Sequence, residues 1–438
     1  MSKDLKTNNK PLHWFSILFA LYVLFFNYSY FFIAGLILCT LQSTRYSYTQ
    51  RQINVLIKIP YVFFLMRLIS GMTENLNYLW KSMSHPHYSL GARFFDLQQV
   101  LVSIKCNFGD IELFYFNFSE YTKSCPWSAN YGPLLEIIPY FGTIWRDTII
   151  ISIILLFFIL FFYEDLLDKF PKEKIYIVVL FLSPSMNFLF ERMNIDIIVL
   201  LLSYYAIKIC NKYQFISSFL LISLALLKLH PLGFTLGIIL YSYIYKKNKL
   251  LKINLLLLVF FSTVYIIFSY LKETALTTTW RPDDPLLAFG ILSDAKYIEK
   301  NFDINLTSAY LLLLMLIVIF LFLNIRYLKI VNLESLDGNQ IIFYSYGVFF
   351  LLNIIYANFD YRIPIFFPLV IYLLPALSKN IKNFLMLPFL LLPFSLPGLE
   401  TGSQLIGAFV GKLCLYGFLL LILRLIYNDI KKIRFTSR

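Results

Sequence analysis

The chain has 438 residues, of which 59% are hydrophobic and 14% are charged. So small a charged fraction cannot cover the surface of a soluble globule of this length, which indicates a polytopic, all-α membrane protein. The net charge of +13 would suit a nucleic-acid-binding protein, but the basic residues lie in short loops beside apolar segments, where they meet anionic lipid. The composition therefore predicts the lipid bilayer as a partner and excludes nucleic acid.

The first apolar segment follows a polar, basic N-terminus and contains no small-residue cleavage site of the Ala-x-Ala kind. We expect it to stay in the membrane and not to be removed as a signal peptide. The run from Pro11 to Gln42 is longer than the roughly 20 residues that one crossing needs, and Asn27 and Tyr28 interrupt it. It is interpreted as a tight hairpin of two helices.

The hairpin also agrees with the basic loops that follow. With two crossings before Arg45, the loops around Arg51, Lys172 and Lys212 share the side of the N-terminus, as the positive-inside rule requires. The further spans are predicted at about 56–74, 147–163, 175–190, 195–210, 214–229, 231–245, 252–271, 307–325, 341–357, 362–377, 382–396 and 404–426. Some are short enough to be broken or re-entrant helices.

These spans make one integral membrane domain, 1–438, with about 12–14 transmembrane helices and both termini cytoplasmic. The expected location is the inner (plasma) membrane of a bacterium. Two extracytoplasmic loops, 73–146 and 272–305, are large enough to fold. In the first, apolar residues from Phe94 to Ile104 recur at helical spacing, which places Asp96 on a juxtamembrane helix.

Two cysteines, Cys106 and Cys125, fall in the first loop, where an oxidising compartment would permit a disulfide; the spacing leaves their pairing open. Asp283 and Asp284 offer two carboxylates to a divalent cation, although two alone are weak evidence for a metal site. The sequence has no Cys/His spacing of a zinc site. No metal is therefore expected.

Soluble catalytic signatures are missing from the sequence: it has no nucleophile elbow, phosphate-binding loop or His-Glu-x-x-His motif. Its motif-like polar residues lie at the ends of apolar segments opposite to the cationic loops such as Lys246–Lys249. Group transfer on that outer face needs a lipid-linked donor, a carboxylate base near the membrane and cations for a phosphate leaving group.

Five short elements in chain order carry a family resemblance: Asp96, Asn130–Leu134, Glu191–Asp196, Leu227–Pro231 and Asn358–Arg362. Their order resembles the GT-C superfamily of integral membrane glycosyltransferases, and within it the glycosyltransferase family 87, the mannosyltransferases that use polyprenyl-phosphate mannose. Two departures from the family pattern are Met193 before Asn194, where the family usually has Gly, and Gly132 within its usual Tyr-Pro-Pro.

The resemblance implies a GT-C-like bundle with juxtamembrane helices and an inverting transfer of a hexose such as mannose from a polyprenyl-phosphate sugar to a glycolipid or glycan acceptor. The position that matches the general base of such enzymes is Asp96, with Asp110 as the fallback. The polar residues expected at the donor phosphate or substrate are Tyr131, Arg192, Asn194, Lys228, His230, Arg281 and Arg362.

Several of these residues have a plainer interpretation. Arg192, Lys228 and Arg362 stand where long basic side chains reach lipid headgroups. Arg192 would be structural if it paired with Glu191 or Asp196. A single histidine at a helix boundary, such as His230, is often no more than a hydrogen-bonding residue.

Two other functions remain open. An O-antigen-type oligosaccharide polymerase or ligase also uses a lipid-linked donor, but its large outer loop generally lies in the second half of the chain. A transporter or flippase predicts two halves with matching interrupted helices and ionisable residues near the middle of the membrane. The largest predicted outer loop here lies in the first half and is acidic, which favours the glycosyltransferase.

Overall fold

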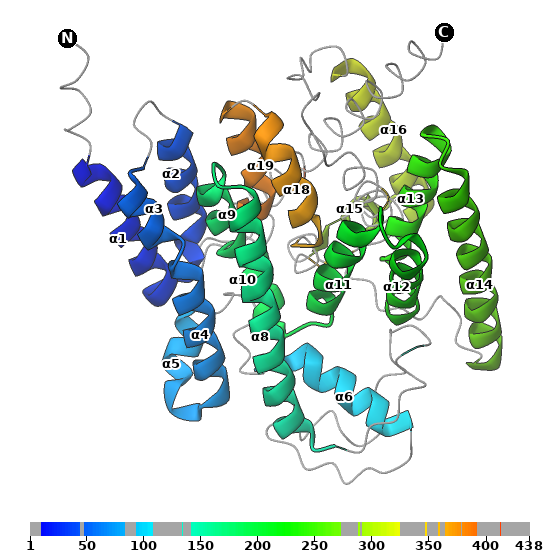
Figure 1. The fold of residues 1–438 in the computed structure, drawn as a ribbon, viewed down its shortest axis with the longest axis horizontal. Helices are drawn as coiled ribbons and strands as arrows, with labels where there is room; N and C mark the ends of the chain where they lie inside the picture. Colours follow the sequence, from blue (N-terminus) through cyan, green and yellow to red (C-terminus); the bar gives the residue numbers. More distant parts are fainter. Residues whose placement is uncertain are drawn as a thin grey trace.

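The computed structural model shows a helical protein (Figure 1). It describes residues 10–43, 48–83, 93–107, 134, 142–272, 288–289, 291–324, 347, 358–359, 364–377, 379–391 and 412. Every regular element in these ranges is helical except one pair of two-residue strands, β1 (Ala288–Phe289) and β2 (Asn358–Phe359). The all-α prediction is confirmed to this extent.

The predicted N-terminal hairpin is confirmed. Helix α1 (Lys10–Phe26) ends just before Asn27, a short 3₁₀ turn η2 (Tyr28–Tyr30) follows, and α2 (Phe31–Ser43) packs back against α1. At the turn, the hydroxyl of Tyr28 donates to the backbone carbonyl of Leu182, 2.6 Å away. The polar side chain that interrupts the apolar run therefore ties the hairpin to the middle of the bundle.

The next apolar segment is a nearly continuous span, Gln50–Met72, made of α3 (Gln50–Leu56) and α4 (Ile59–Met72). It begins with a capping box in which Thr49 accepts from the backbone of Gln52 and the Gln52 side chain accepts in return. The 3₁₀ turn η3 (Glu74–Leu76) and helix α5 (Asn77–Met83) fold back onto α4 and α1.

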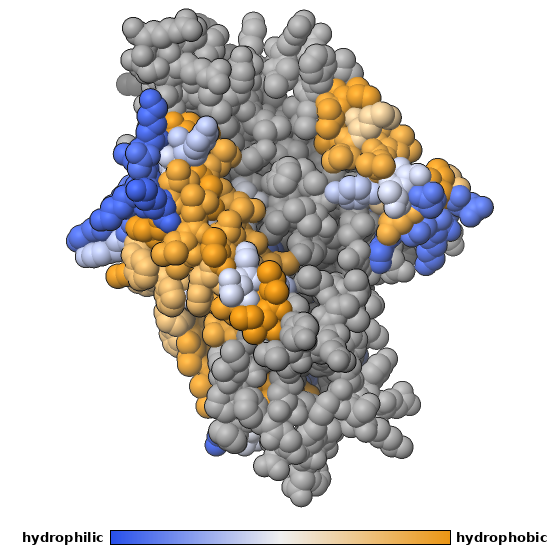
Figure 2. All heavy atoms as spheres, turned by 90° about the vertical axis from the view of Figure 1, so that its right-hand side faces the viewer, coloured by the Kyte–Doolittle hydropathy of each residue, from blue (hydrophilic) through white to orange (hydrophobic). Residues whose placement is uncertain are grey.

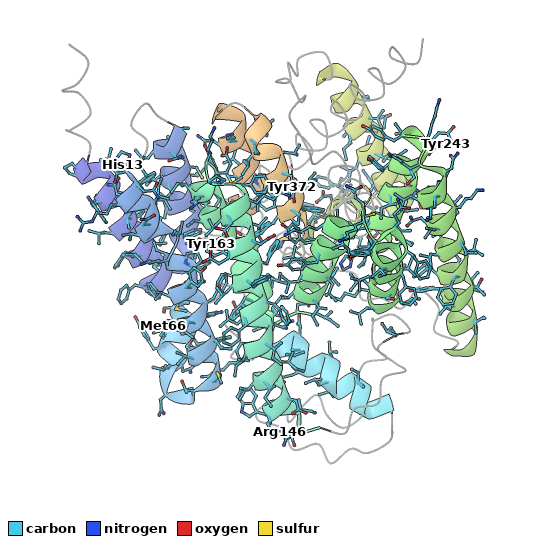
Figure 3. All side chains as sticks on the ribbon, in the orientation of Figure 1. His13, Met66, Arg146, Tyr163, Tyr243 and Tyr372 are labelled. Carbon is cyan, nitrogen blue, oxygen red and sulfur yellow. The ribbon has the colours of Figure 1, made fainter. Side chains whose placement is uncertain are left out.

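A helix is present around Asp96 as predicted, α6 (Phe95–Asn107), and its juxtamembrane placement stays a prediction. Its apolar residues Leu97, Val100, Leu101 and Ile104 are buried, and it packs on α8 (Ile144–Lys169) and α10 (Pro184–Arg192). In Figure 1 α6 runs obliquely beside the lower end of α8. Figure 3 places Arg146 at that end of the molecule, whereas His13 and Tyr243 lie at the other.

After α8 the chain forms α9 (Lys174–Phe181), α10, α11 (Asp196–Ile209), α12 (Gln214–Leu227), α13 (Leu232–Ile244) and α14 (Asn248–Lys272), the last of which lies at one side of the molecule (Figure 1). The single helix predicted at 175–190 is in fact the pair α9 and α10, bent by 45°. The bend has a local cause, because Ser183 caps α10 and Pro184 occupies its first turn, where a missing N–H carries no penalty.

The C-terminal part described by the structure contains α15 (Ile291–Phe302), α16 (Leu306–Asn324), α18 (Phe367–Leu373), the 3₁₀ turn η7 (Leu374–Ala376) and α19 (Lys379–Leu391). The antiparallel pair joins Ala288 to Phe359 and Phe289 to Asn358. It places Ala288 and Phe289, which belong to the outer loop predicted at 272–305, beside the start of the Asn358–Arg362 element. The spans predicted at 341–357 and 404–426 lie outside the described residues, apart from Gly347 and Lys412.

Within the described residues, three helices are long and apolar enough to cross a membrane, Gln50–Met72, Ile144–Lys169 and Asn248–Ile267, and the α9–α10 pair makes up to four. Their outer faces are apolar: Ile154, Phe158 and Phe161 of α8 are about half exposed or more. Figure 2 shows such an apolar surface on the side formed by α14, with hydrophilic atoms at one edge. A membrane-spanning protein is thus indicated, and the count of 12–14 spans stays a prediction.

Gly71 of α4 allows two aromatic rings to approach the helix closely. A Cβ atom there would lie 2.4 Å from Cζ of Phe94 and 2.8 Å from Cζ3 of Trp80, and both rings are buried. We expect Gly71→Ala to lower the unfolding temperature of the purified protein, since overpacking of a filled core costs about 1–3 kcal/mol.

Gly35 of α2 provides the matched control for this substitution. Its added Cβ would meet the end of the flexible Leu390 side chain, 2.7 Å from Cδ2, and a leucine methyl group shifts more easily than two aromatic rings. Both substitutions bring the same gain in helix propensity, about 1 kcal/mol. Equal unfolding temperatures for Gly71→Ala and Gly35→Ala would show that the rings of Phe94 and Trp80 move aside without a measurable cost in stability.

Candidate functional site

Asp96 lies in the first turn of α6 and is only 4% exposed. One carboxylate oxygen forms an ion pair with Nη2 of Arg192 at 2.5 Å, and the other accepts a hydrogen bond from the side-chain amide of Asn194. The predicted base from the first outer loop therefore meets two residues of the Glu191–Asp196 element, about a hundred positions further along the chain.

Arg192 and Asn194 reach Asp96 because the chain turns sharply between α10 and α11. Met193 caps α10 in the left-handed conformation, with φ 46° and ψ 47°. That conformation costs a non-glycine residue about 1–2 kcal/mol, so glycine would adopt it more easily at this position. Here the cost is offset by complete burial of the Met193 side chain.

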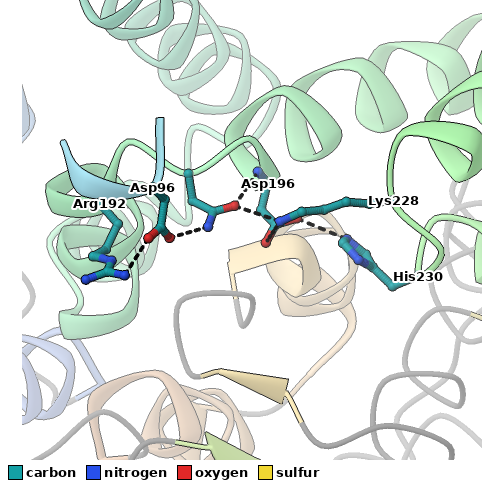
Figure 4. A network of polar contacts seen from close by, with 6 residues as sticks. Asp96, Arg192, Asp196, Lys228 and His230 are labelled. Carbon is teal, nitrogen blue, oxygen red and sulfur yellow. Dashed lines mark hydrogen bonds and ion pairs between the residues drawn. The ribbon is translucent and has the colours of Figure 1, made fainter. Parts of the chain in front are cut away.

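The second half of the site is formed by Lys228, Asp196 and His230 (Figure 4). The ammonium group of Lys228 lies 2.8 Å from Oδ1 of Asn194 and 2.9 Å from Oδ2 of Asp196. Nε2 of His230 lies 3.3 Å from Oδ1 of Asp196. Asn194 joins the two halves, because its amide donates to Asp96 while its oxygen accepts from Lys228 and from the backbone N–H of Asp196.

Helix ends explain why these residues converge. Asp196 occupies the first turn of α11, where the helix dipole favours a negative charge. Lys228 is the C-cap of α12 and has an extended conformation, and Pro231 is the N-cap of α13 three residues later, so Lys228 and His230 lie in one short connection. The cationic residues Lys208, Lys212 and Lys246 stand at the other ends of these helices, as the sequence predicts.

We name the six residues Asp96, Arg192, Asn194, Asp196, Lys228 and His230 the site network. Two carboxylates face two cations, so its formal charge is zero when His230 is neutral. The side chain of Asp196 is 0% exposed and that of Lys228 is 6% exposed. Removing such charges from water costs several kcal/mol per ion, and ionisable groups beside apolar helices generally mark functional sites.

Arg192 is the most accessible charged member of the site network, with 19% of its side chain exposed against 6% for Asp96. An anionic ligand approaching from solvent or lipid headgroups would therefore meet a guanidinium before it meets the carboxylate. A guanidinium binds phosphate oxygens through two parallel N–H donors. The most exposed charged group of the site network is thus one whose chemistry suits phosphate, and a carboxylate lies 2.5 Å from it.

Four predicted site residues, Asp110, Tyr131, Arg281 and Arg362, lie outside the described residues, as do Asp283 and Asp284. Cys125 lies outside them too, so its pairing with Cys106 stays a prediction. Among the residues that the structure describes, no group of three or more His, Cys, Asp or Glu side chains is placed to hold a metal ion.

Sequence reasoning missed Arg67. It lies within the apolar span of α4, is completely buried and forms an ion pair with Glu191 at 2.8 Å. The signal was visible, because an arginine inside an apolar segment is rare without a buried partner. The central role of Asp196 was also missed, since nothing in its sequence neighbourhood points to Lys228 or His230 as partners.

Comparison of the chain with protein-family models, with curated proteins and with solved structures found no match. The function of the site must therefore be inferred from the chemistry of its own residues.

Proposed function

We propose that the protein is a membrane glycosyltransferase that moves a hexose, such as mannose, from a polyprenyl-phosphate donor to a glycolipid or glycan acceptor on the extracytoplasmic face. The acceptor hydroxyl attacks the anomeric carbon as its proton passes to the carboxylate of Asp96. The new bond from oxygen to carbon forms as the bond from carbon to the phosphate oxygen breaks. Polyprenyl phosphate leaves with the electron pair, and the configuration inverts.

One observation carries this proposal: the contact of Asp96 with Arg192 and Asn194. Three of the separated elements that suggest a glycosyltransferase, Asp96, Glu191–Asp196 and Leu227–Pro231, supply all the members of the site network. Residues so distant in the chain would have no reason to meet if each were a solvated loop residue.

The cations supply the second requirement of the reaction. Arg192 and Lys228 lie on opposite sides of Asn194, and charge that develops on the leaving phosphate is stabilised by preorganised cations in a site that excludes water. Asp196 holds Lys228 in place. His230 adds a further group that can donate to a phosphate oxygen.

The carboxylate of Asp96 contacts Arg192 and Asn194 in the structure, and binding of the sugar donor would change these contacts. A donor phosphate offers Arg192 a second anionic partner, so the guanidinium turns from Asp96 toward the phosphate. The carboxylate oxygen released in this way accepts the proton of the acceptor hydroxyl. A base positioned in this manner supplies about 10²–10⁴ in rate.

The proposal includes a bundle of 12–14 helices in a bacterial plasma membrane, with both termini cytoplasmic.

To test the function, membranes containing the protein are given radiolabelled polyprenyl-phosphate hexoses, mannose included. We expect label to move to a lipid or glycan fraction, and matched membranes without the protein to show no such transfer. Failure with every donor at a verified protein level would contradict the proposal; transfer of preassembled oligosaccharides alone would indicate a polymerase or ligase.

The broken helix pair α9–α10 favours a transporter or flippase as the second candidate, since discontinuous helices often line transport sites. Fully buried Ser183, Ser185 and Asn187 lie at or just after the break. Movement of a labelled lipid-linked sugar across proteoliposomes without any covalent transfer would establish that function and remove the need for a base at Asp96.

A further inference from the structure

Four residues behind the site network form a closed circuit of contacts, which we call the Arg67 cluster: Arg67, Trp80, Phe94 and Glu191. Arg67 lies 2.8 Å from Glu191, donates from Nη1 to the backbone carbonyl of Trp80 at 2.6 Å, and stacks 3.9 Å from the Trp80 ring. Trp80 meets Phe94 edge to face, with ring centroids 5.5 Å apart. The backbone N–H of Phe94 donates to the carbonyl of Glu191 at 3.2 Å, which closes the circuit.

The Arg67 cluster holds both sides of the ion pair between Asp96 and Arg192. Phe94 stands two residues before Asp96, and Glu191 stands directly before Arg192. The cluster joins α4, α5, the start of α6 and the end of α10, so the two partners of the ion pair are located by the same set of contacts.

Backbone conformation agrees with a positioning role. Phe94, with φ 52°, and Met193, with φ 46°, both adopt the left-handed region, and they flank the segments that present Asp96 and Arg192. A bulky residue stays in that region only where its surroundings determine its conformation, and such strain gathers at functional sites. The edge-to-face contact of Phe94 with Trp80 and its backbone hydrogen bond to Glu191 supply those surroundings.

Burial of the charged groups of Arg67 and Glu191 also brings no evident gain in the stability of the fold. Their side chains are 0% and 3% exposed, and a buried ion pair can generally be replaced by apolar residues at little or no loss of stability. The presence of this buried pair therefore calls for another role.

We propose, on the basis of the glycosyltransferase function above, that Arg67 and Glu191 are positioning residues that act through the backbone of Phe94 and through Arg192 to hold Asp96 and Arg192 in the geometry of transfer. Neither residue touches the substrate. Loss of the pair should lower kcat and leave the KM for the donor nearly unchanged, because binding groups remain while the reacting groups lose their alignment.

The test uses the full-length double variant Arg67→Met/Glu191→Leu, which removes both charges and avoids an unpaired one. We expect an unfolding temperature close to that of the wild type, a fall in kcat of about tenfold to hundredfold, and faster hydrogen exchange in peptides 93–107 and 186–196 than in the wild type. Peptide 214–227 of α12 serves as the internal reference.

The matched control is Lys382→Met/Glu173→Leu, which removes a partly buried ion pair of 2.8 Å near the start of α9, at the other end of the α9–α10 pair. It should leave exchange in 93–107 and 186–196 unchanged. Wild-type kcat or unchanged exchange in Arg67→Met/Glu191→Leu would overturn the positioning role. A third outcome separates the two proposals. If exchange in both peptides is faster in Arg67→Met/Glu191→Leu but the wild type transfers no sugar, the Arg67 cluster does position the segments of Asp96 and Arg192, and the proposed reaction is contradicted.

Discussion

Asp96→Asn is expected to lower the rate of sugar transfer by about 10²–10⁴ while donor binding is retained. The amide is almost the same size as the carboxylate, but it cannot take a proton from the attacking hydroxyl. Arg192, Lys228 and His230 remain available to the donor phosphate. The measurement is the initial rate of transfer from a radiolabelled polyprenyl-phosphate hexose, with donor binding and protein level determined on the same membranes.

Asp165→Asn is the matched control for Asp96→Asn. Asp165 is also a carboxylate held by a cation and a second donor, the ammonium of Lys208 and the hydroxyl of Tyr204, each 2.6 Å away. It lies near the end of α8 that is remote from Arg146. We expect normal transfer in this variant. Normal transfer by Asp96→Asn would show that Asp96 is not the base, and Asp110 would then be the residue to test.

Lys228→Met is expected to destabilise the protein by about 3–5 kcal/mol, the usual cost of removing one partner from a buried ion pair. The substitution leaves Asp196, whose side chain is 0% exposed, with a buried negative charge beside His230. Asn194 loses a donor to its side-chain oxygen as well. The measurement is the denaturant or temperature midpoint of the purified protein.

Two variants distinguish lost charge pairing from lost packing at Lys228. In Lys228→Met/Asp196→Leu both charges are gone, and we expect most of the lost stability to return while transfer stays low. Lys208→Met removes the cation from a half-exposed pair, with side chains 39% and 24% exposed, where about 0–1 kcal/mol is the usual effect. A double variant as unstable as Lys228→Met would show that packing of the lysine stem, and not its charge, supplies the stability.

Much of the helical architecture could be predicted from sequence, because helix boundaries in apolar segments depend on local residues. The spans predicted at 214–229, 231–245 and 307–325 match α12, α13 and α16 closely. The interruption at Asn27 marked the N-terminal hairpin correctly. The bend between α9 and α10 was missed although Ser183 and Pro184 signal a new helix start, since the apolar run around them dominated the interpretation.

Pairing between distant polar residues was not predictable in the same way. Arg192 had two nearby carboxylates, Glu191 and Asp196, as candidate partners in the sequence, and only the packing of α6 on α10 brings it to Asp96. Arg67 of α4 meets Glu191 of α10, more than a hundred positions away, and the backbone N–H of Phe94 donates to the carbonyl of the same Glu191. Such contacts depend on the relative placement of whole helices, which no local pattern records.

The sequence by itself determined that the chain is a helical membrane protein with its polar motifs at one end of its helices, because apolar composition and helical spacing are local properties with few physical solutions. Only the tertiary structure decided that Asp96, Arg192, Asn194, Asp196, Lys228 and His230 form one network and that the Arg67 cluster stands behind it. Charges withdrawn from water are stable only beside particular partners, and those partners are chosen by the packing of helices far apart in the chain.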